Sequence, residues 1–175
     1  MNMEKENEIK ENKKAVIWLA LGHGLSDSYA GFINPILPFI VANIGATLAM
    51  GTFALSASQL FSSLMQPVFG FLADKWQKRF FIFWGVLLAS VFFSLTGLVH
   101  NIWQLTLCLI IGGIGSGFYH PQATGFVVRY SGKNLAKDMS IFIASGTIGY
   151  SLGPIISSSI TQFFGISKLP FACVW

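Results

Sequence analysis

Charge is scarce in this sequence: Asp, Glu, Lys and Arg together make up 10% of its 175 residues, whereas 53% are hydrophobic. A soluble domain carries about 25% charged residues, so the composition excludes an ordinary soluble domain. It also excludes a disordered chain, which requires low hydrophobicity. The few charges lie in short stretches between long apolar runs and form no basic face, so we expect no nucleic-acid partner.

Cysteines and catalytic motifs are equally scarce. The two cysteines, Cys108 and Cys173, lie in apolar sequence and indicate neither a disulfide framework nor a metal site. The sequence contains no His-Glu-x-x-His motif, no Gly-x-Ser-x-Gly motif and no pair of aspartates within an apolar run. We therefore expect no enzyme, no catalytic residue, no metal and no cofactor.

What the sequence has instead is long apolar runs. A helix needs about 20 mostly apolar residues to cross the hydrocarbon layer of a membrane. Five complete runs of that kind occur, and a sixth begins near the end of the chain; their ranges are 15–41, 46–73, 80–99, 102–128, 139–165 and 169–175. The sequence thus predicts an all-α multi-pass membrane protein, with a polar tail at 1–14 and a transmembrane bundle at 15–175.

The basic residues predict the orientation of this bundle. Ten of the eleven Lys and Arg residues lie in the tail, in the connection after the second run and in the connection after the fourth. Lys168 alone lies in a connection on the other side. Because Lys and Arg in short loops favour the cytoplasmic side, we expect a cell-membrane protein whose N-terminus is cytoplasmic.

In the first run, His23, Asp27 and Asn34 lie within a sector of about 40° on one helix face. Asp27 is the one formal charge inside any run. Such residues usually face a bundle interior or a wet cavity and mark an ion or proton path. The alternative is that Asp27 is a neutral, hydrogen-bonded packing residue.

The second run also has a polar stripe, which can serve as a polar substrate wall or as a set of interhelical hydrogen bonds. Its members lie within a sector of about 80°; they are Ser56, Gln59, Ser63 and Gln66. The third run has no ionisable or amide side chain, so we expect it to be the most lipid-exposed of the five.

The fourth run is rich in glycine and contains Tyr119-His120-Pro121. Proline within a helix removes a backbone hydrogen bond and produces a kink, so His120 lies beside a predicted kink. Either this histidine is incidental, or it is a titratable group beside a water-filled path. In the fifth run, Gly146, Gly149, Gly153 and Pro154 predict a flat face for close helix packing.

Several motifs resemble the major facilitator superfamily. Its signature between the second and third helices is Gly-x-Leu-Ala-Asp-Arg-x-Gly-Arg-Arg, and the matching residues here are Gly70, Leu72, Ala73, Asp74, Lys78 and Arg79. Lys75 replaces the first arginine, and Gln77 stands where glycine is expected. The stretch Gly149-Tyr-Ser-Leu-Gly153-Pro154 resembles the antiporter signature of the same superfamily, whereas the usual arginine of its fourth-helix motif is absent.

Two further stretches are similar to the fosmidomycin-resistance branch of drug exporters: His23-Gly-Leu-Ser-Asp27-Ser-Tyr29-Ala-Gly31-Phe32-Ile-Asn34-Pro35-Ile-Leu-Pro38, and Tyr119-His120-Pro121. The resemblance implies a twelve-helix fold of two six-helix halves that rock around a central site. The first and fourth helices would line the cavity, the second and fifth would meet the other half, and Asp74 would hold the cytoplasmic side closed.

The function that the resemblance implies is proton-coupled efflux of small molecules, with the lipid bilayer, substrate, protons and a missing C-terminal half as partners. Asp27 would be the protonation site, and the cavity residues would further include His23, Tyr29, Asn34, Gln59 and His120. The motif around Gly70, Asp74, Lys78 and Arg79 would form the gate. The alternatives are a non-functional truncated product, or a transporter of another solute such as a sugar or an organic anion.

Overall fold

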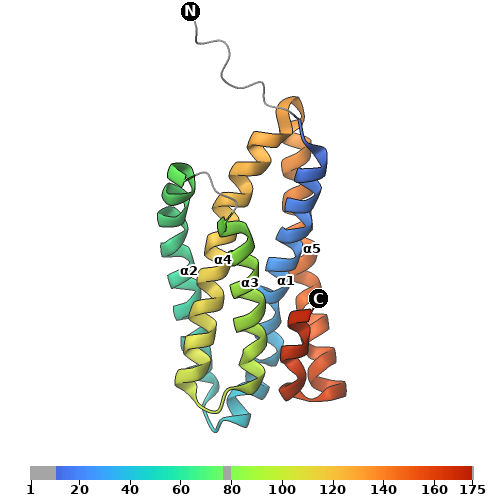
Figure 1. The fold of residues 1–175 in the computed structure, drawn as a ribbon. Helices are drawn as coiled ribbons and strands as arrows, with labels where there is room; N and C mark the ends of the chain where they lie inside the picture. Colours follow the sequence, from blue (N-terminus) through green and yellow to red (C-terminus); the bar gives the residue numbers. More distant parts are fainter. Residues whose placement is uncertain (1–10, 77–79, 175) are drawn as a thin grey trace, which may run out of the picture.

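The computed structural model describes residues 11–76 and 80–174, and it places them in a bundle of five long helices (Figure 1). The helices are α1 (Lys13–Asn43), α2 (Leu48–Trp76), α3 (Phe80–Leu95), α4 (Ile102–Ser131) and α5 (Leu135–Phe164). Three short 3₁₀ segments accompany them: η1 (Thr96–Leu98), η2 (Gly132–Asn134) and η3 (Ile166–Val174). No strand occurs in these ranges, so the predicted all-α class is confirmed.

Local sequence signals explain where the helices begin and turn. The Asn12 side chain accepts a hydrogen bond from the backbone N–H of Ala15, and Asn101 accepts one from Gln104, which caps the N-termini of α1 and α4. Gly45, with a φ of 67°, follows α1 and adopts a left-handed conformation that glycine tolerates best. These caps and turns allow short connections between antiparallel helices.

Three continuous helical stretches within the described residues are long and apolar enough to cross a membrane: 48–72, 80–98 and 102–164. The last stretch comprises α4 and α5 with η2 between them, and each of these helices has 30 residues, enough for a separate crossing. α1 is not among the three. It carries the polar stripe of the first apolar run, and it lies inside the bundle.

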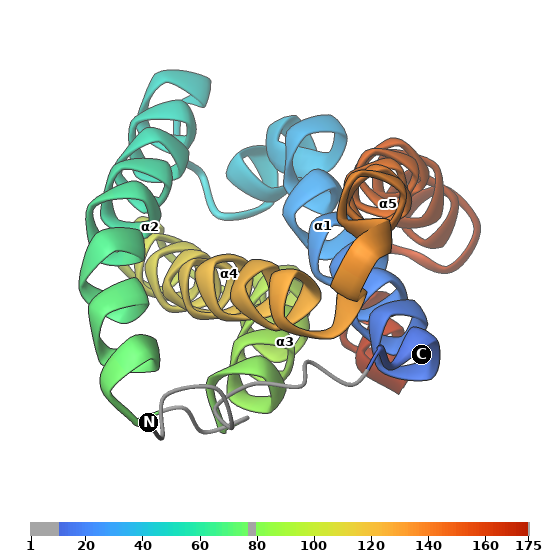
Figure 2. The ribbon, with the colours of Figure 1, turned by 90° about the horizontal axis from the view of Figure 1, so that it is seen from above.

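α1 and α4 form the centre of the bundle, as the view from above shows (Figure 2). α1 packs between α5 and α4, while α4 also contacts α2 and α3. The main apolar core joins Phe32, Ile33 and Ile36 of α1 to Leu105 and Leu109 of α4, all of which are buried. The core therefore fixes how α1 and α4 face one another.

Within the described residues α2 is more exposed than α3, while the lipid exposure expected of the third apolar run stays a prediction. In the most apolar part of α2 only 17% of residues are buried, against 44% in that of α3. The reason is that α3 packs against α4, α1 and η3, whereas α2 packs mainly against α4. α2 consequently presents large apolar side chains on its outer surface, including Phe53, Leu60 and Leu64.

Three chain segments lie together at one end of the bundle: the start of α1, the facing ends of α2 and α3, and the η2 turn (Figure 1). Lys13, Lys75 and Lys133 belong to these segments. At this end the Glu11 carboxylate accepts hydrogen bonds from the Lys133 backbone N–H and from the Asn134 side chain. The start of α1 is thereby tied to the turn between α4 and α5.

Candidate functional site

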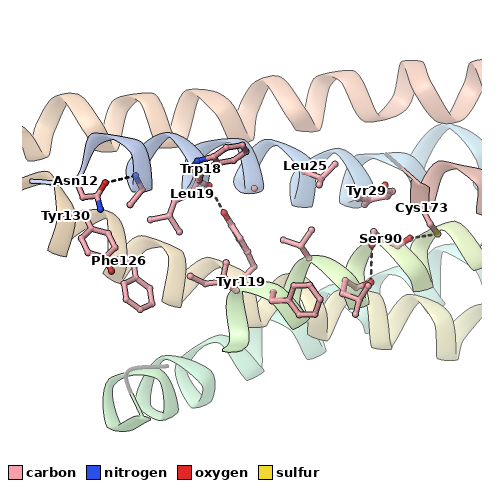
Figure 3. Close-up of a pocket in the computed structure, with 16 residues that line it drawn as sticks. Asn12, Trp18, Leu19, Leu25, Tyr29, Ser90, Tyr119, Phe126, Tyr130 and Cys173 are labelled. Carbon is pink, nitrogen blue, oxygen red and sulfur yellow. Dashed lines mark hydrogen bonds between the residues drawn. The ribbon is translucent and has the colours of Figure 1, made fainter. Parts of the chain in front are cut away.

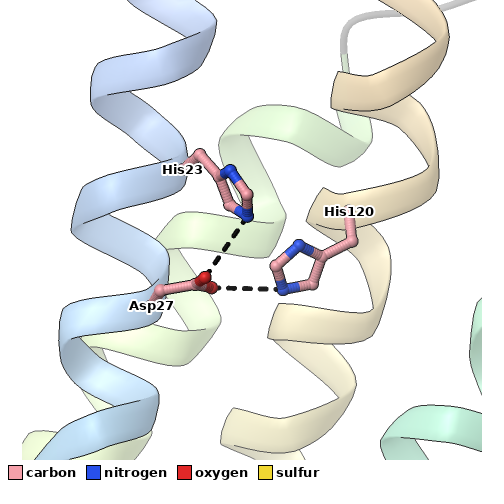
Figure 4. A group of neighbouring side chains, drawn as sticks. All are labelled: His23, Asp27 and His120. Atoms are coloured by element: carbon pink, nitrogen blue, oxygen red, sulfur yellow. Dashed lines mark ion pairs between the residues drawn. The ribbon is translucent and has the colours of Figure 1, made fainter. Parts of the chain in front are cut away.

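The bundle interior holds a cluster of three ionisable side chains, His23 and Asp27 from α1 and His120 from α4 (Figure 4). We call it the His-Asp-His cluster. The His23 Nε2 atom lies 3.3 Å from Asp27 Oδ2, and the His120 Nε2 atom lies 3.3 Å from Asp27 Oδ1. The side chains are 11%, 19% and 27% exposed for His23, Asp27 and His120, so the cluster is shielded but open on one side.

Helix geometry and packing bring these residues together. His23 and Asp27 are four residues apart and so lie on the same face of α1, one turn from each other. His120 reaches them because the shared core holds α4 against α1. The hydroxyl of Tyr119 strengthens this contact: it donates a hydrogen bond of 2.5 Å to the backbone carbonyl of Leu19.

The orientation of the His23 ring is fixed from α5. Its Nδ1 atom lies 2.8 Å from the backbone carbonyl oxygen of Phe142, which can only accept, so Nδ1 carries a proton. The ring also stacks on the Phe142 ring, with 4.1 Å between centroids and 20° between planes. The Nε2 atom therefore points at Asp27.

This orientation sets the proton content of the cluster. A neutral imidazole protonated at Nδ1 has a lone pair at Nε2, and a lone pair facing a carboxylate oxygen is repelled. The contact between His23 and Asp27 therefore requires a cation between the two atoms, for example a proton held on either partner. With such a cation in place, the contact balances the charge of the Asp27 carboxylate.

Close packing of α5 on α1 makes this arrangement possible. A Cβ atom at Gly146 would lie 2.5 Å from His23 Cε1 and 2.8 Å from Asp27 Oδ2. At Gly149 it would overlap the backbone carbonyl of Gly24, and at Gly153 that of Ser28.

The predicted small-residue face thus packs against α1 within this chain. The resemblance implies that the fifth helix meets the other half of the protein. The glycine face is already packed against α1, so it is not available for that contact. Other positions of α5 stay exposed, among them Ile148, Leu152 and Ile155.

Two of the predicted cavity residues lie away from the cluster. Tyr29 is about 200° around α1 from Asp27, and its buried hydroxyl donates a 2.6 Å hydrogen bond to the Ala172 carbonyl of η3. Asn34 is exposed and donates to the Tyr150 hydroxyl of α5, at 3.2 Å. Tyr29 therefore connects α1 to η3, and it is not part of the His-Asp-His cluster.

Gln59 lines a different, small cavity of about 180 Å³, whose lining comes mainly from α2 and α4 and also includes Ala30 of α1 and Tyr150 of α5. It is exposed there, and its neighbours in the lining include the hydroxyl groups of Ser58, Ser62 and Ser116. The Ser58 hydroxyl donates to the Leu109 carbonyl, but Ser58 is not a member of the second-run stripe, so this bond does not decide between a substrate wall and interhelical hydrogen bonding for the stripe. Ser116 also lies 3.1 Å from His120 Nε2, so this polar wall reaches the His-Asp-His cluster.

A wider cavity of about 750 Å³ lies on the other side of α1, between α1, α3, α4 and η3 (Figure 3). Trp18, Leu25, Tyr29, Phe126 and Cys173 are among its lining residues. None of the three cluster residues lines it, and its lining is mostly apolar. This cavity is therefore separate from the His-Asp-His cluster.

The predicted gate motif is only partly within the described residues. Gly70 lies on α2, where a Cβ atom would be 3.6 Å from the Cβ of Pro121, so the motif begins beside the proline of α4. Asp74 lies in the last turn of α2, but its side chain is outside the described part of the structure. Lys78 and Arg79 lie outside the described residues altogether.

Three groups at the site were not predicted from the sequence to belong to it. Ser116 could have been found, because it precedes His120 by four residues and therefore shares its helix face. The Phe142 carbonyl could not, because backbone groups carry no sequence signal. Gly146 was assigned to packing alone, although its missing side chain also leaves room for His23 and Asp27.

A bundle of long apolar helices with an ionisable cluster enclosed between two of them is the architecture of a multi-pass membrane transport protein. Residues 19–174 match the family model of the Major Facilitator Superfamily, and the chain belongs to this superfamily.

Known relatives are similar over most of this chain. The fosmidomycin resistance protein of Escherichia coli is 28% identical to this chain over 84% of the chain. The sialic acid transporter NanX of the same organism is 28% identical over 87% of the chain. The quinolone resistance protein NorA of Staphylococcus aureus is 30% identical over 81% of the chain. The matched regions cover 36%, 37% and 36% of those proteins, so the chain spans about a third of their length.

Proposed function

We propose that this chain is the N-terminal part of a secondary active transporter that exports small molecules in exchange for protons. The observation that carries the proposal is the His-Asp-His cluster. It places the one formal charge of the apolar runs against two histidines, in the bundle interior, with a partly open side. In membrane proteins such residues mark ion and proton pathways.

In this mechanism the cluster holds the coupling proton, with Asp27 as the protonation site. Loss of that proton would leave the carboxylate facing the His23 Nε2 lone pair, which favours a rearrangement of α1 against α4. Substrate would enter from the side on which His120 is 27% exposed, and Gln59 and Asn34 would contribute polar contacts along the same face. The remaining half of the transporter would cover the cluster.

We further propose that the N-terminus is cytoplasmic, with Gly70, Asp74, Lys78 and Arg79 forming a gate on that side. The support is that the start of α1, the facing ends of α2 and α3 and the η2 turn share one end of the bundle, and these segments carry most of the basic residues. Asp74 would pair with basic residues of the second half when the cytoplasmic side is closed.

The export direction and the substrate class are supported by the relatives. Two of them are named for resistance to fosmidomycin or to quinolones. A second candidate is transport of an organic anion such as a sialic acid, which the similarity to NanX favours. The two histidines of the His-Asp-His cluster would suit an anionic substrate, because imidazolium groups attract carboxylates.

The test is an Asp27→Asn substitution in the complete gene that encodes this chain, expressed in a host that lacks its own drug exporters. We expect the variant to reach the membrane in normal amounts and to lose drug resistance, to the level seen when a proton uncoupler is added to the unsubstituted protein. His100→Asn is the matched control, because His100 lies in the connection between α3 and α4. Uncoupler-sensitive transport that persists in Asp27→Asn would remove Asp27 from the mechanism.

A further inference from the structure

We propose that the His-Asp-His cluster binds one divalent transition-metal cation of the zinc type. Within the described part of the chain, His23, Asp27 and His120 form a group whose possible ligand atoms all lie within 4.8 Å of one another. No metal is expected from the sequence, because neither cysteine lies in a ligand pattern. The proposed ligands instead come from two helices that are distant in the sequence.

The spacing of the ligand atoms supports a metal. Both imidazole nitrogens lie 3.3 Å from a carboxylate oxygen of Asp27, which is longer than the roughly 2.7 to 2.9 Å of a charge-assisted hydrogen bond. In a tetrahedral zinc site with ligand bonds of about 2.0 to 2.1 Å, adjacent ligand atoms are about 3.3 to 3.4 Å apart. Each nitrogen thus has tetrahedral ligand spacing from one carboxylate oxygen, His23 from Oδ2 and His120 from Oδ1. Metal binding requires a small turn of the Asp27 carboxylate and an approach of the two nitrogens, which all lie within 4.8 Å as possible ligand atoms.

The contact behind His23 also has the form found in metal sites. Histidine ligands usually donate their second N–H to a carbonyl or carboxylate, which fixes the tautomer and the ring direction. The Nδ1 atom of His23 lies 2.8 Å from the Phe142 carbonyl, and the ring stacks on the Phe142 side chain. The Nε2 lone pair is therefore already directed at the position between His23 and Asp27 that a cation would occupy.

His120 is similarly able to act as a ligand. The Ser116 hydroxyl lies 3.1 Å from its Nε2 atom and can donate to it, so this nitrogen can accept without carrying a proton. On metal binding the hydroxyl would turn away and leave the lone pair to the cation. The ring of His23 packs edge-on against that of His120, with 5.1 Å between centroids, which limits the ways in which the two rings can separate.

The donor chemistry selects the class of metal. Two neutral imidazoles and one carboxylate give the site a single negative charge. Imidazole nitrogen suits Zn²⁺, Ni²⁺ and Cu²⁺, whereas Mg²⁺ and Ca²⁺ require oxygen ligands. The exposed side of Asp27 and His120 leaves a fourth position for water, as in zinc sites with three protein ligands.

The test measures metal binding by this chain, purified in detergent without a histidine tag. Zn²⁺ titration by calorimetry should give one site per chain, and a large excess of Mg²⁺ should not compete. Co²⁺ should give the intense visible absorption of a four-coordinate site, which Zn²⁺ abolishes. Asp27→Asn and His120→Asn should each weaken Zn²⁺ binding by about 100-fold or more, since loss of an outer partner alone costs 10- to 100-fold.

His100→Asn is the control, because it removes the third histidine of the chain and leaves the cluster intact. Helical circular dichroism checks that each variant is folded. If a variant does not fold, the Co²⁺ spectrum of the unsubstituted chain still tests the site. Absence of a stoichiometric site, a six-coordinate Co²⁺ spectrum, or equal binding by Asp27→Asn and the unsubstituted chain would overturn the proposal. No substrate or proton gradient is present, so the result does not depend on whether the proposed transport is correct.

Discussion

The contact between α5 and α1 can be tested by adding one methyl group at Gly149. A Cβ atom there would overlap the backbone carbonyl of Gly24, whereas ordinary contacts begin at 3.4 Å. Because the obstacle is backbone on a rigid helix, the two helices must separate over their whole contact. Overpacking typically costs about 1 to 3 kcal/mol, and a backbone obstacle places Gly149→Ala near the upper end. After a gain of about 1 kcal/mol in helix propensity, we expect a net loss of about 2 kcal/mol.

The matched control is Gly125→Ala, a chemically identical change in the interior of α4. A Cβ atom at Gly125 has no neighbour within 4 Å, so we expect unchanged stability or a gain of up to about 1 kcal/mol. Both variants are measured in the same detergent by unfolding with sodium dodecyl sulfate, followed by tryptophan fluorescence. If Gly149→Ala is as stable as Gly125→Ala, then α5 does not approach α1 as closely as described and the reasoning is refuted.

Two further substitutions test single contacts by the same unfolding assay. Tyr119→Phe removes the hydrogen bond to the Leu19 carbonyl and should cost about 1 to 2 kcal/mol, because a buried acceptor loses its partner; an unchanged transition would contradict this bond. Gly45→Ala should cost about 1 kcal/mol through backbone strain alone, because φ is 67° and no atom lies within 4 Å of the added carbon. Gly45→Asn, which tolerates this conformation better, should lose less, and equal losses would argue against strain as the cause.

The helices themselves could be predicted because each apolar run is far longer than a soluble helix needs to be. Their ends could be predicted less well. α1 and α4 extend beyond the expected spans, to Asn43 and Ser131, since interhelical contacts and turn glycines decide where a helix stops. The run expected to start near Leu169 belongs to a 3₁₀ segment that begins at Ile166.

The site could be predicted only in part, because periodicity describes one helix at a time. It placed His23, Asp27 and Asn34 on a common face of α1, but only His23 and Asp27 join the cluster, whereas Asn34 lies about two turns further on and contacts Tyr150. The resemblance added Tyr29, although this residue lies on the opposite side of the helix. His120 faces Asp27 because α4 packs on α1. The residue pattern within a single helix does not show which other helix will pack against it.

The packing of α5 and the chemistry of the cluster depend on the same residues. Gly146 leaves the space that the His23 ring and the Asp27 carboxylate occupy. The close approach of α5 brings the Phe142 carbonyl within 2.8 Å of His23 Nδ1, and this bond determines which nitrogen faces Asp27. A shift of α5 away from α1 would release that nitrogen and with it the requirement for a cation between His23 and Asp27. The glycine face of α5 therefore couples the distance between α5 and α1 to the orientation of the His23 ring, and so to the cation between His23 and Asp27.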